Sequence, residues 1–446
     1  MPYTEMDNIT LTKLALISER AQKNPKFQFT SLAHLLNEGF LKECYWGLGR
    51  DRASGIDGVS WKEYGERLDE NIINLVARLK GKRYKPQPSR RVYIPKDEHS
   101  KRPLGLPALE DKIVQKGIAR ILEAIYEQDF LDCSYGFRPN RDCHAALKAV
   151  DKAIWRDRIS YVIEADIKRF FDNVSHDWML RCLQVRILDP SLLLLIRRFL
   201  EAGYIDAGEF VATTRGTPQG GNLSPILSNI FLHYVLDLWF EKKIKPKVQG
   251  ACHLVRYADD FVCMVQRLDD AQYIEQAMQQ RFAKFNLELH PEKTRIVAFS
   301  SRGRDNVNQD KHRPHTFDFL GFTHYEGKTH KGYIIPCRKT SSKRLRRACK
   351  ELAEWLKMIR SSAKLKDWWP TLQAKLRGHY QYYGISGNSR ALAHYCYATD
   401  HLIFKWLNRR SQKVSFSWKG YRAYLKHYPF PQPRIVYRLY TPSSDS

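Results

Sequence analysis

Two neighbouring aspartates in the segment RYADDFVCMV, residues 256–265, constrain the fold more than any other feature of the chain. Asp259 and Asp260 stand between two apolar runs, a pattern typical of two short strands joined by a turn. Aspartate is common in turns, so the pair alone is also consistent with an ordinary hairpin. The other carboxylates of the chain therefore decide whether the pair has a chemical role.

A third aspartate, Asp166, ends the apolar strand pattern SYVIEAD and precedes a helical pattern. An aspartate in this place is also a common helix-initiating residue. If the two strands are neighbours in one sheet, Asp166 meets Asp259 and Asp260. Three unpaired carboxylates would repel one another, whereas divalent cations neutralise them, and oxygen-only ligands suit Mg²⁺. Two Mg²⁺ ions about 3.5–4 Å apart assist in-line phosphoryl displacement in polymerases and some nucleases.

The periodicity of apolar residues predicts an α+β fold with a small antiparallel sheet. Helical patterns cover residues 108–128, 141–157, 175–202, 223–242 and 270–285. Strand patterns cover residues 90–95, 161–166, 253–258, 261–266 and 294–299. The length of 446 residues predicts two or three domains, because a single core rarely grows so large.

The charge of the chain favours a polyanionic partner. The formal net charge is +26, and residues 338–446 alone contain 23 Lys and Arg against 5 Asp and Glu. An anionic membrane surface is the rival partner, but the start MPYTEMDN lacks the features of a signal peptide and the run LLLLI from Leu192 is far too short to span a bilayer. Nucleic acid is therefore the expected partner, with no membrane association.

The nine cysteines are scattered, without a Cys-x-x-Cys pair. This spacing predicts free thiols in a reducing compartment and no structural zinc module. We therefore expect a cytoplasmic protein without a zinc-dependent nuclease domain.

A basic helix is predicted at residues 340–360, TSSKRLRRACKELAEWLKMIR. One face is apolar at spacings of four and three residues and consists of Leu345, Cys349, Leu352, Leu356 and Ile359. The remaining surface carries basic residues that are expected to contact RNA phosphates, among them Arg344, Arg346, Arg347 and Lys350. A merely solvated cationic face is the alternative. Aromatic residues that follow suit either base stacking or a small core, and spacing does not separate these two roles.

Seven ordered blocks resemble the reverse transcriptases, and the first two resemble the bacterial group II intron branch in particular. In chain order they are RYKPQPSRRVYIPKDEHSKRPLGLPALEDKIVQKGIARIL, SYGFRPNRDCHAAL, EADIKRFFDNVSH, RGTPQGGNLSPILSNIFLHYVLD, YADD, HPEKTRIVAF and FDFLGF. The resemblance implies a right-hand polymerase fold of fingers, palm with a small antiparallel sheet, and helical thumb, followed by a small basic helical region. It divides the chain into an N-terminal extension (1–60), fingers and palm (61–325), thumb (326–385) and a maturase-like region (386–446).

The resemblance also implies roles for individual residues. Asp166, Asp259 and Asp260 match the catalytic, metal-binding aspartates, with the backbone carbonyl of Ile167 as a further ligand. Two Mg²⁺ ions are the implied cofactors, with Mn²⁺ as a substitute.

Further matches concern the incoming nucleotide and the primer. Lys96 and Arg102 match residues that hold the triphosphate, and their charges suit phosphate oxygens. Phe171 matches the aromatic gate that excludes a ribose 2′-OH, and Gln219 matches a residue lining the nucleotide pocket. Lys293 matches a palm lysine near the active site. The segment FLGF resembles the primer grip, a hairpin that positions the primer 3′ end.

The implied reaction is RNA-templated addition of dNTPs to the 3′-OH of a DNA or RNA primer. The segment KLRGHYQYYG, which contains Arg377, resembles the thumb and maturase region of group II intron proteins, and implies binding of structured intron RNA. About sixty residues follow it, without a Cys- and His-rich endonuclease, so target-site cleavage by this chain is not expected.

Three functions are compatible with the sequence, which leaves the oligomeric state open. The first is an intron-encoded reverse transcriptase that helps its parent RNA to splice and move. The second is a free-standing relative co-opted for repair, phage defence or spacer acquisition, and intron RNA structure flanking the reading frame would separate it from the first. The third is an RNA-binding scaffold with a relic polymerase, which the intact aspartates, Lys96, Arg102 and TPQGG disfavour.

Overall fold

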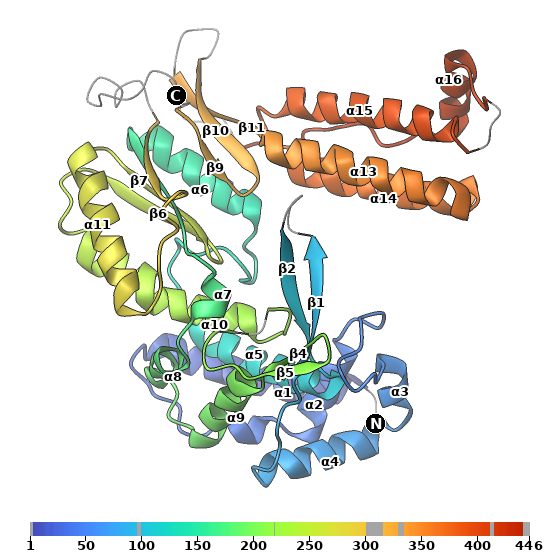
Figure 1. Cartoon of the computed structure of the whole chain (residues 1–446). Helices are drawn as coiled ribbons and strands as arrows, with labels where there is room; N and C mark the ends of the chain where they lie inside the picture. The colour runs from blue at the N-terminus through green and yellow to red at the C-terminus, as the bar shows by residue number, and fades with distance from the viewer. Residues whose placement is uncertain are drawn as a thin grey trace. The chain divides into compact units, whose positions relative to one another are not determined.

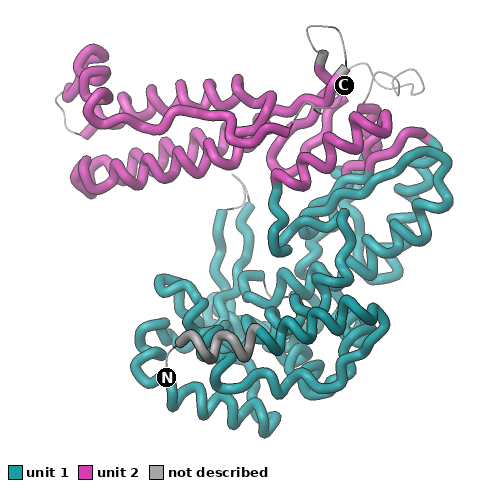
Figure 2. Tube along the Cα trace, turned by 180° about the vertical axis from the view of Figure 1, so that it is seen from behind, with its two compact units in different colours: residues 1–143, 165–263, 269–295 teal, residues 144–164, 264–268, 296–446 magenta. Residues whose placement is uncertain are grey.

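The computed structural model describes residues 3–95, 100–217, 219–299, 315–328, 334–410 and 414–439. The chain forms two compact units, each assembled from several stretches of sequence (Figure 2). Unit 1 comprises residues 1–143, 165–263 and 269–295, and unit 2 comprises residues 144–164, 264–268 and 296–446. In the part described, no helix combines the length and the apolar character that crossing a membrane requires.

Helices precede and follow the first strands of unit 1 (Figure 1). They are α1 (Tyr3–Lys23), η1 (Ala33–Leu35), α2 (Glu38–Trp46), α3 (Trp61–Glu66), α4 (Leu68–Lys80) and α5 (Leu109–Tyr126). Side-chain caps define two of the starts, because Asn37 accepts from the amide of Phe40 in α2, and Ser60 and Glu63 form a capping box at α3. The amphipathic α5 contacts α1 and α2 and forms the centre of this part of the core.

The first sheet has the strand order β2-β1-β4-β5. Its strands are β1 (Ser89–Pro95), β2 (Lys101–Leu106), β4 (Tyr204–Asp206) and β5 (Glu209–Val211). β1 and β2 are antiparallel, with Ile94 opposite Arg102, whereas β4 joins β1 in parallel, with Tyr204 opposite Ser89. Segments more than a hundred residues apart in sequence therefore share one sheet.

The second sheet has the order β6-β7-β3-β8. Its strands are β3 (Tyr161–Asp166), β6 (Cys252–Tyr257), β7 (Asp260–Val265) and β8 (Arg295–Ala298). The helices along the same part of the chain are α6 (Cys143–Arg156), α7 (Phe170–Asn173), α8 (His176–Gln184), α9 (Pro190–Glu201), α10 (Ser224–Leu232), η2 (His233–Asp237), η3 (Phe240–Ile244) and α11 (Leu268–Lys284). The first three residues of β3 and the last five of β7 are buried, which explains their continuous apolar runs.

In its described residues, unit 2 ends in a three-stranded antiparallel sheet and four helices. These are β9 (Phe317–Phe319), β10 (Phe322–Lys328), β11 (Ile334–Thr340), α13 (Ser342–Ser362), α14 (Leu365–Tyr383), α15 (Ser389–Leu407) and α16 (Trp418–His427). The FLGF segment forms the hairpin between β9 and β10, and its central residues Leu320 and Gly321 both have the positive φ that a tight hairpin turn requires.

The prediction of mixed helices and small antiparallel sheets is confirmed, but two predicted helices are interrupted. The pattern at 175–202 forms α8 and α9, because the Asp189 side chain accepts from the amides of Ser191 and Leu192 and starts a new helix at Pro190. The pattern at 223–242 gives α10 followed by the π-helical segments η2 and η3. Amphipathic spacing alone does not distinguish these variants from one continuous helix.

A buried histidine in unit 2 makes its stability sensitive to acid. The fully buried His324 stacks on Phe317 at 4.6 Å between ring centroids, and neither of its ring nitrogens has a hydrogen-bond partner among the described residues. Burial, with a smaller contribution from Arg338, lowers the pKa of His324 to about 3. The unfolded chain takes up this proton below about pH 6.5, and the folded chain does so only near pH 3, so His324 destabilises the folded state increasingly across that interval.

The substitution His324→Phe is expected to remove this acid sensitivity. The free energy of unfolding of the variant, relative to the natural chain, should rise as the pH falls from 8 to 5, by at most about 1.4 kcal/mol per pH unit. Urea unfolding monitored at several pH values measures the difference, and a difference that is constant from pH 8 to pH 5 would contradict the assignment. Because both proteins share every other titrating group, those groups cancel in the comparison.

Candidate active site

The turn between β6 and β7 presents the two neighbouring aspartates. β6 ends at Tyr257 and β7 starts at Asp260, so that Ala258 and Asp259 form a tight connection. Ala258 is buried and has φ of 58°, a backbone conformation that is uncommon for a residue with a side chain. Asp259 is half-buried and Asp260 is exposed.

Asp166 lies at the end of the strand next to this turn. β3 neighbours β7 in the sheet, and the amide of Ser160, just before β3, donates to the carbonyl of Val265 at the end of β7 at 3.1 Å. The two strands therefore run antiparallel, and the end of β3 lies beside the start of β7. The structure thus brings Asp166 next to the turn that carries Asp259 and Asp260.

Lys293 contacts Asp166 directly. Its Nζ lies 2.6 Å from Asp166 Oδ2, and the backbone of the same segment is attached as well, because the amide of His290 donates to the Asp166 carbonyl at 2.7 Å. The Lys293 and Asp166 side chains are 53% and 42% exposed, so the ion pair stabilises the fold by at most about 1 kcal/mol. Its main effect is to place a positive charge against the Asp166 carboxylate.

The donor chemistry at this place fits a hard divalent cation. The Asp166 carboxylate is partly exposed and forms an ion pair with the ammonium group of Lys293. Asp259 and Asp260 supply further carboxylate oxygens, the ligand type that such cations prefer. Ile167, whose carbonyl is the predicted extra ligand, is buried and forms a bridge to Leu289. Among the described residues, no three His, Cys, Asp or Glu side chains form a group that could hold a metal ion, so the complete ligand set stays a prediction.

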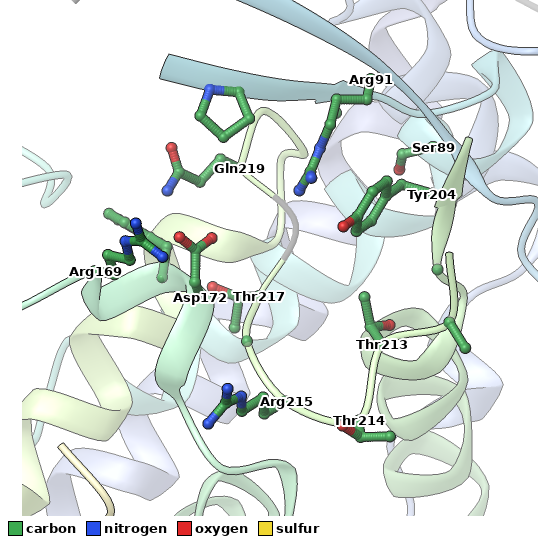
Figure 3. Close-up of a pocket in the computed structure, with 16 residues that line it drawn as sticks. Ser89, Arg91, Arg169, Asp172, Tyr204, Thr213, Thr214, Arg215, Thr217 and Gln219 are labelled. Carbon is green, nitrogen blue, oxygen red and sulfur yellow. The ribbon is translucent and has the colours of Figure 1, made fainter. Parts of the chain in front are cut away.

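A cavity of about 360 Å³ lies in unit 1 beneath β1 (Figure 3). Two predicted nucleotide-binding residues, Phe171 and Gln219, line it. The backbone holds both in place, since the amide of Thr217 donates to the Phe171 carbonyl at 2.7 Å and the amide of Gly105 donates to the Gln219 carbonyl at 2.6 Å. The structure therefore brings the predicted sugar gate and the predicted pocket residue to one cavity.

Close packing requires glycine on the loop that carries Gln219. Gly220 has φ of 111°, and a Cβ atom built there would lie 2.5 Å from the carbonyl oxygen of Gly105. Since side chains rarely adopt this conformation and the neighbour is backbone, only glycine fits. The loop thus lies directly against β2.

The structure does not place Arg102, a predicted phosphate contact, at this cavity. Lys96 lies outside the described residues, and Arg102 is exposed on β2 and is not among the residues that line the cavity. Three arginines that sequence reasoning missed do line it, namely Arg91, Arg169 and Arg215 (Figure 3). The available signals were the position of Arg169 two residues before Phe171, and of Arg215 at the start of the RGTPQGG block.

The cationic residues predicted to bind RNA lie in unit 2, on α13 and α14. Arg344, Arg346, Lys350 and Arg377 are exposed, and Arg347 is half-buried and pairs with Glu351 at 2.6 Å. The predicted apolar face of α13 is confirmed, because its five members belong to the core of this helical region, with Leu352 and Leu356 fully buried.

The structure separates the aromatic residues that spacing could not assign. Trp368, Trp369, Tyr380 and Tyr395 are buried in the helical core and are therefore unavailable for stacking on bases. Trp418 is 42% exposed, although it stacks on Phe404 at 3.8 Å. Most large aromatic side chains of α14 thus serve packing.

Comparison with known proteins identifies the family of the chain. The chain belongs to the reverse transcriptase (RNA-dependent DNA polymerase) family, which matches residues 94–324, and it is therefore an RNA-directed DNA polymerase. Enzymes of this family use divalent metal ions.

Three relatives illustrate the similarity. The group II intron-encoded protein LtrA of Lactococcus lactis subsp. cremoris is 29% identical over 89% of this chain and 77% of its own length. Protein YkfC of Escherichia coli (strain K12) is 36% identical over 47% of this chain and 63% of its own length. An uncharacterized 91 kDa protein in the cob intron of Schizosaccharomyces pombe is 40% identical over 52% of this chain and 29% of its own length.

Proposed function

We propose that this reverse transcriptase is of the group II intron type, copies RNA by adding dNTPs to a DNA or RNA primer, and binds its parent intron RNA to assist splicing and retromobility. The observation that carries the catalytic part is the position of Asp166 at the end of β3, beside the turn with Asp259 and Asp260. The likeness to the intron-encoded protein LtrA supports the RNA partner.

The three aspartates hold two Mg²⁺ ions in this proposal, with the Ile167 carbonyl as a further ligand and Mn²⁺ as a substitute. Bound divalent cations supply charge stabilisation for the attacking 3′-oxygen and the leaving pyrophosphate. The half-exposed Lys293 orients the Asp166 carboxylate through their 2.6 Å contact and balances part of its charge.

The incoming nucleotide is held from two sides. Lys96 and Arg102 bind its triphosphate, for which a point charge and a bidentate guanidinium are suited. Phe171 lies against the sugar and Gln219 lines the same cavity. The resulting preference is for a dNTP, because the aromatic ring occupies the space of a ribose 2′-OH.

A right-hand polymerase architecture accommodates these roles. Residues 1–60 form an N-terminal extension, 61–325 the fingers and palm, 326–385 the thumb, and 386–446 a basic maturase-like region. The FLGF hairpin between β9 and β10 acts as the primer grip.

RNA binding by the cations of α13 should depend strongly on salt. Replacing Arg346, Arg347 and Lys350 together with glutamine is expected to reduce the slope of log affinity against log salt concentration by roughly 0.7–0.9 for each lost phosphate contact. Filter binding from 50 to 400 mM KCl measures the slope. A matched triple variant of the exposed Lys242, Lys243 and Lys247 removes the same charge elsewhere and should leave the slope nearly unchanged. Equal slopes for all three proteins would restore the interpretation as a solvated face.

The intron role is tested by competition between RNAs. Labelled RNA transcribed from the locus that flanks the reading frame is bound to the protein, and unlabelled structured RNA of equal length and unrelated sequence is added. Retention of the locus RNA against a hundredfold excess, together with faster splicing in the presence of the protein, supports the proposal. Equal competition without any effect on splicing assigns the chain to a role independent of the intron.

A further inference from the structure

A buried arginine donates a hydrogen bond to the turn that carries Asp259. Arg256, near the end of β6, is 0% exposed, and its partner Asp237 in η2 is also 0% exposed. Nε and Nη2 of Arg256 donate to the two carboxylate oxygens of Asp237 at 2.8 and 2.6 Å. This pair is bidentate, the strongest geometry for an arginine and a carboxylate.

The other donors of the same guanidinium reach three further segments. Nη1 donates to Asn229 Oδ1 and to the carbonyl of Ala258, both at 2.9 Å, and Nη2 donates to Ser134 Oγ at 2.7 Å. Together with the two bonds to Asp237, these bonds use all five N–H donors of the side chain. Lysine has three donors without a planar fork and cannot reproduce this set.

One of these five bonds acts on the turn itself. The carbonyl of Ala258 belongs to the peptide unit that joins Ala258 to Asp259, and Ala258 has φ of 58°. A residue with a side chain retains such a conformation only where its surroundings determine it. The bond from Arg256 therefore fixes the peptide plane from which Asp259 continues.

The loop at residues 133–136 contacts the same turn and the strand that precedes it. The amide of Arg256 donates to the carbonyl of Cys133 at 2.7 Å, and the amide of Tyr135 donates to the carbonyl of Arg256 at 2.8 Å. A Cβ atom on Gly136 would lie 2.4 Å from the amide nitrogen of Ala258, and the Gly136 carbonyl accepts from Asn229 Nδ2 at 2.7 Å. The turn is thus enclosed by backbone and by one network centred on Arg256.

The stability of the fold does not explain such a network. Removing two charges from water costs several kcal/mol per ion, and replacing a buried ion pair by apolar residues of similar size is often neutral or stabilising. Because desolvation of the Arg256–Asp237 pair costs free energy, we explain the pair by the conformation that it imposes on the turn at Ala258 and Asp259.

We infer that Arg256 is a positioning residue of the polymerase, which fixes the Asp259 carboxylate by holding the Ala258–Asp259 peptide through the network with Asp237, Asn229 and Ser134. The inference rests on the proposed catalytic role of Asp259. An error of about 1 Å in the position of a reacting group typically costs on the order of 10²-fold in rate.

The test removes the pair without leaving a buried charge. The double variant Arg256→Met, Asp237→Leu is compared with a matched double variant, Arg186→Met, Asp129→Leu. The Arg186 and Asp129 side chains are 1% and 10% exposed and lie 3.3 Å apart in the same unit. The Arg186 guanidinium also donates to the carbonyls of Asn24 and Ala21, which belong to neither the turn nor the strands beside it. The variant Arg256→Lys serves as a second probe, because it keeps the charge opposite Asp237.

Three measurements are made on each protein: kcat and dNTP KM in primer extension, RNA affinity, and hydrogen exchange of the peptide covering residues 256–265. We expect kcat to fall about 30- to 100-fold for both Arg256 variants. The dNTP KM and the RNA affinity should stay within about threefold, and the turn amides should exchange faster, because the bond that orders them is lost. The Arg186 variant should keep kcat and the exchange of this peptide.

Each contrary outcome overturns the inference. A kcat within twofold of the natural chain in a folded Arg256 variant does so, as does unchanged exchange at the turn, or an equal loss of kcat in the Arg186 variant. If the double variant does not fold, the same comparisons are made with Arg256→Lys. An Asp259→Ala protein that still synthesises DNA refutes the proposed function, whereas its inactivity beside fully active Arg256 variants refutes only the positioning role.

Discussion

Replacing Asp259 with alanine is expected to reduce DNA synthesis by about 10³-fold or more while RNA binding stays within about twofold. The turn between β6 and β7 places this carboxylate beside the end of β3, where Asp166 offers a second one. Loss of Asp259 removes one of the proposed ligands for the divalent cation and leaves the cationic helices of unit 2 intact. Primer extension on an RNA template, with single-turnover rates, measures the effect.

A carboxylate elsewhere in the same unit provides the control for this experiment. The Asp177 side chain on α8 is 79% exposed and lies 3.9 Å from Arg197, a contact of little energetic weight. Asp177→Ala should therefore extend primers at the natural rate. DNA synthesis by Asp259→Ala at more than a tenth of the natural rate would exclude this aspartate as a catalytic ligand.

The second large effect concerns the choice of sugar. Replacing Phe171 with valine is expected to increase rNTP incorporation relative to dNTP by about 10- to 100-fold, because a smaller side chain at the cavity leaves room for a 2′-OH. The ratio of kcat/KM for rCTP and dCTP measures it. The same substitution at Phe210, which is 58% exposed on β5, is the control and should leave the ratio unchanged. An unchanged ratio in Phe171→Val would remove this residue from sugar selection.

Local sequence patterns predicted the elements that depend on neighbours along the chain. The strand that ends at Asp166, the turn at Asp259 and the apolar face of α13 are visible as runs of defined period, and the structure contains all three. The division between α8 and α9 was missed because it depends on a single cap, Asp189. The spacing of apolar residues, averaged over many positions, does not detect a single capping hydrogen bond.

Features that depend on distant contacts were not predictable in the same way. Arg91 lines the cavity because β1 pairs with β4, a contact across more than a hundred residues, and its guanidinium lies 3.4 Å from the ring centroid of Tyr204. The local sequence does not distinguish Arg256 from the other arginines of this basic protein, although its side chain is fully buried. A single sequence does not show which of many arginines lose their contact with water.

The burial of the aromatic residues of α14 limits which features of an RNA this helical region can recognise. With Trp368, Trp369 and Tyr380 in the core, the residues predicted to contact RNA here are exposed cations such as Arg346 and Arg377, which suit phosphate contacts. Binding by such a surface depends on the positions of the phosphates in a folded RNA. If intron RNA binds here as proposed, an intron whose bases change while its helices keep their positions would remain a partner, and a change that moves one helix would end the association without altering any contacted base.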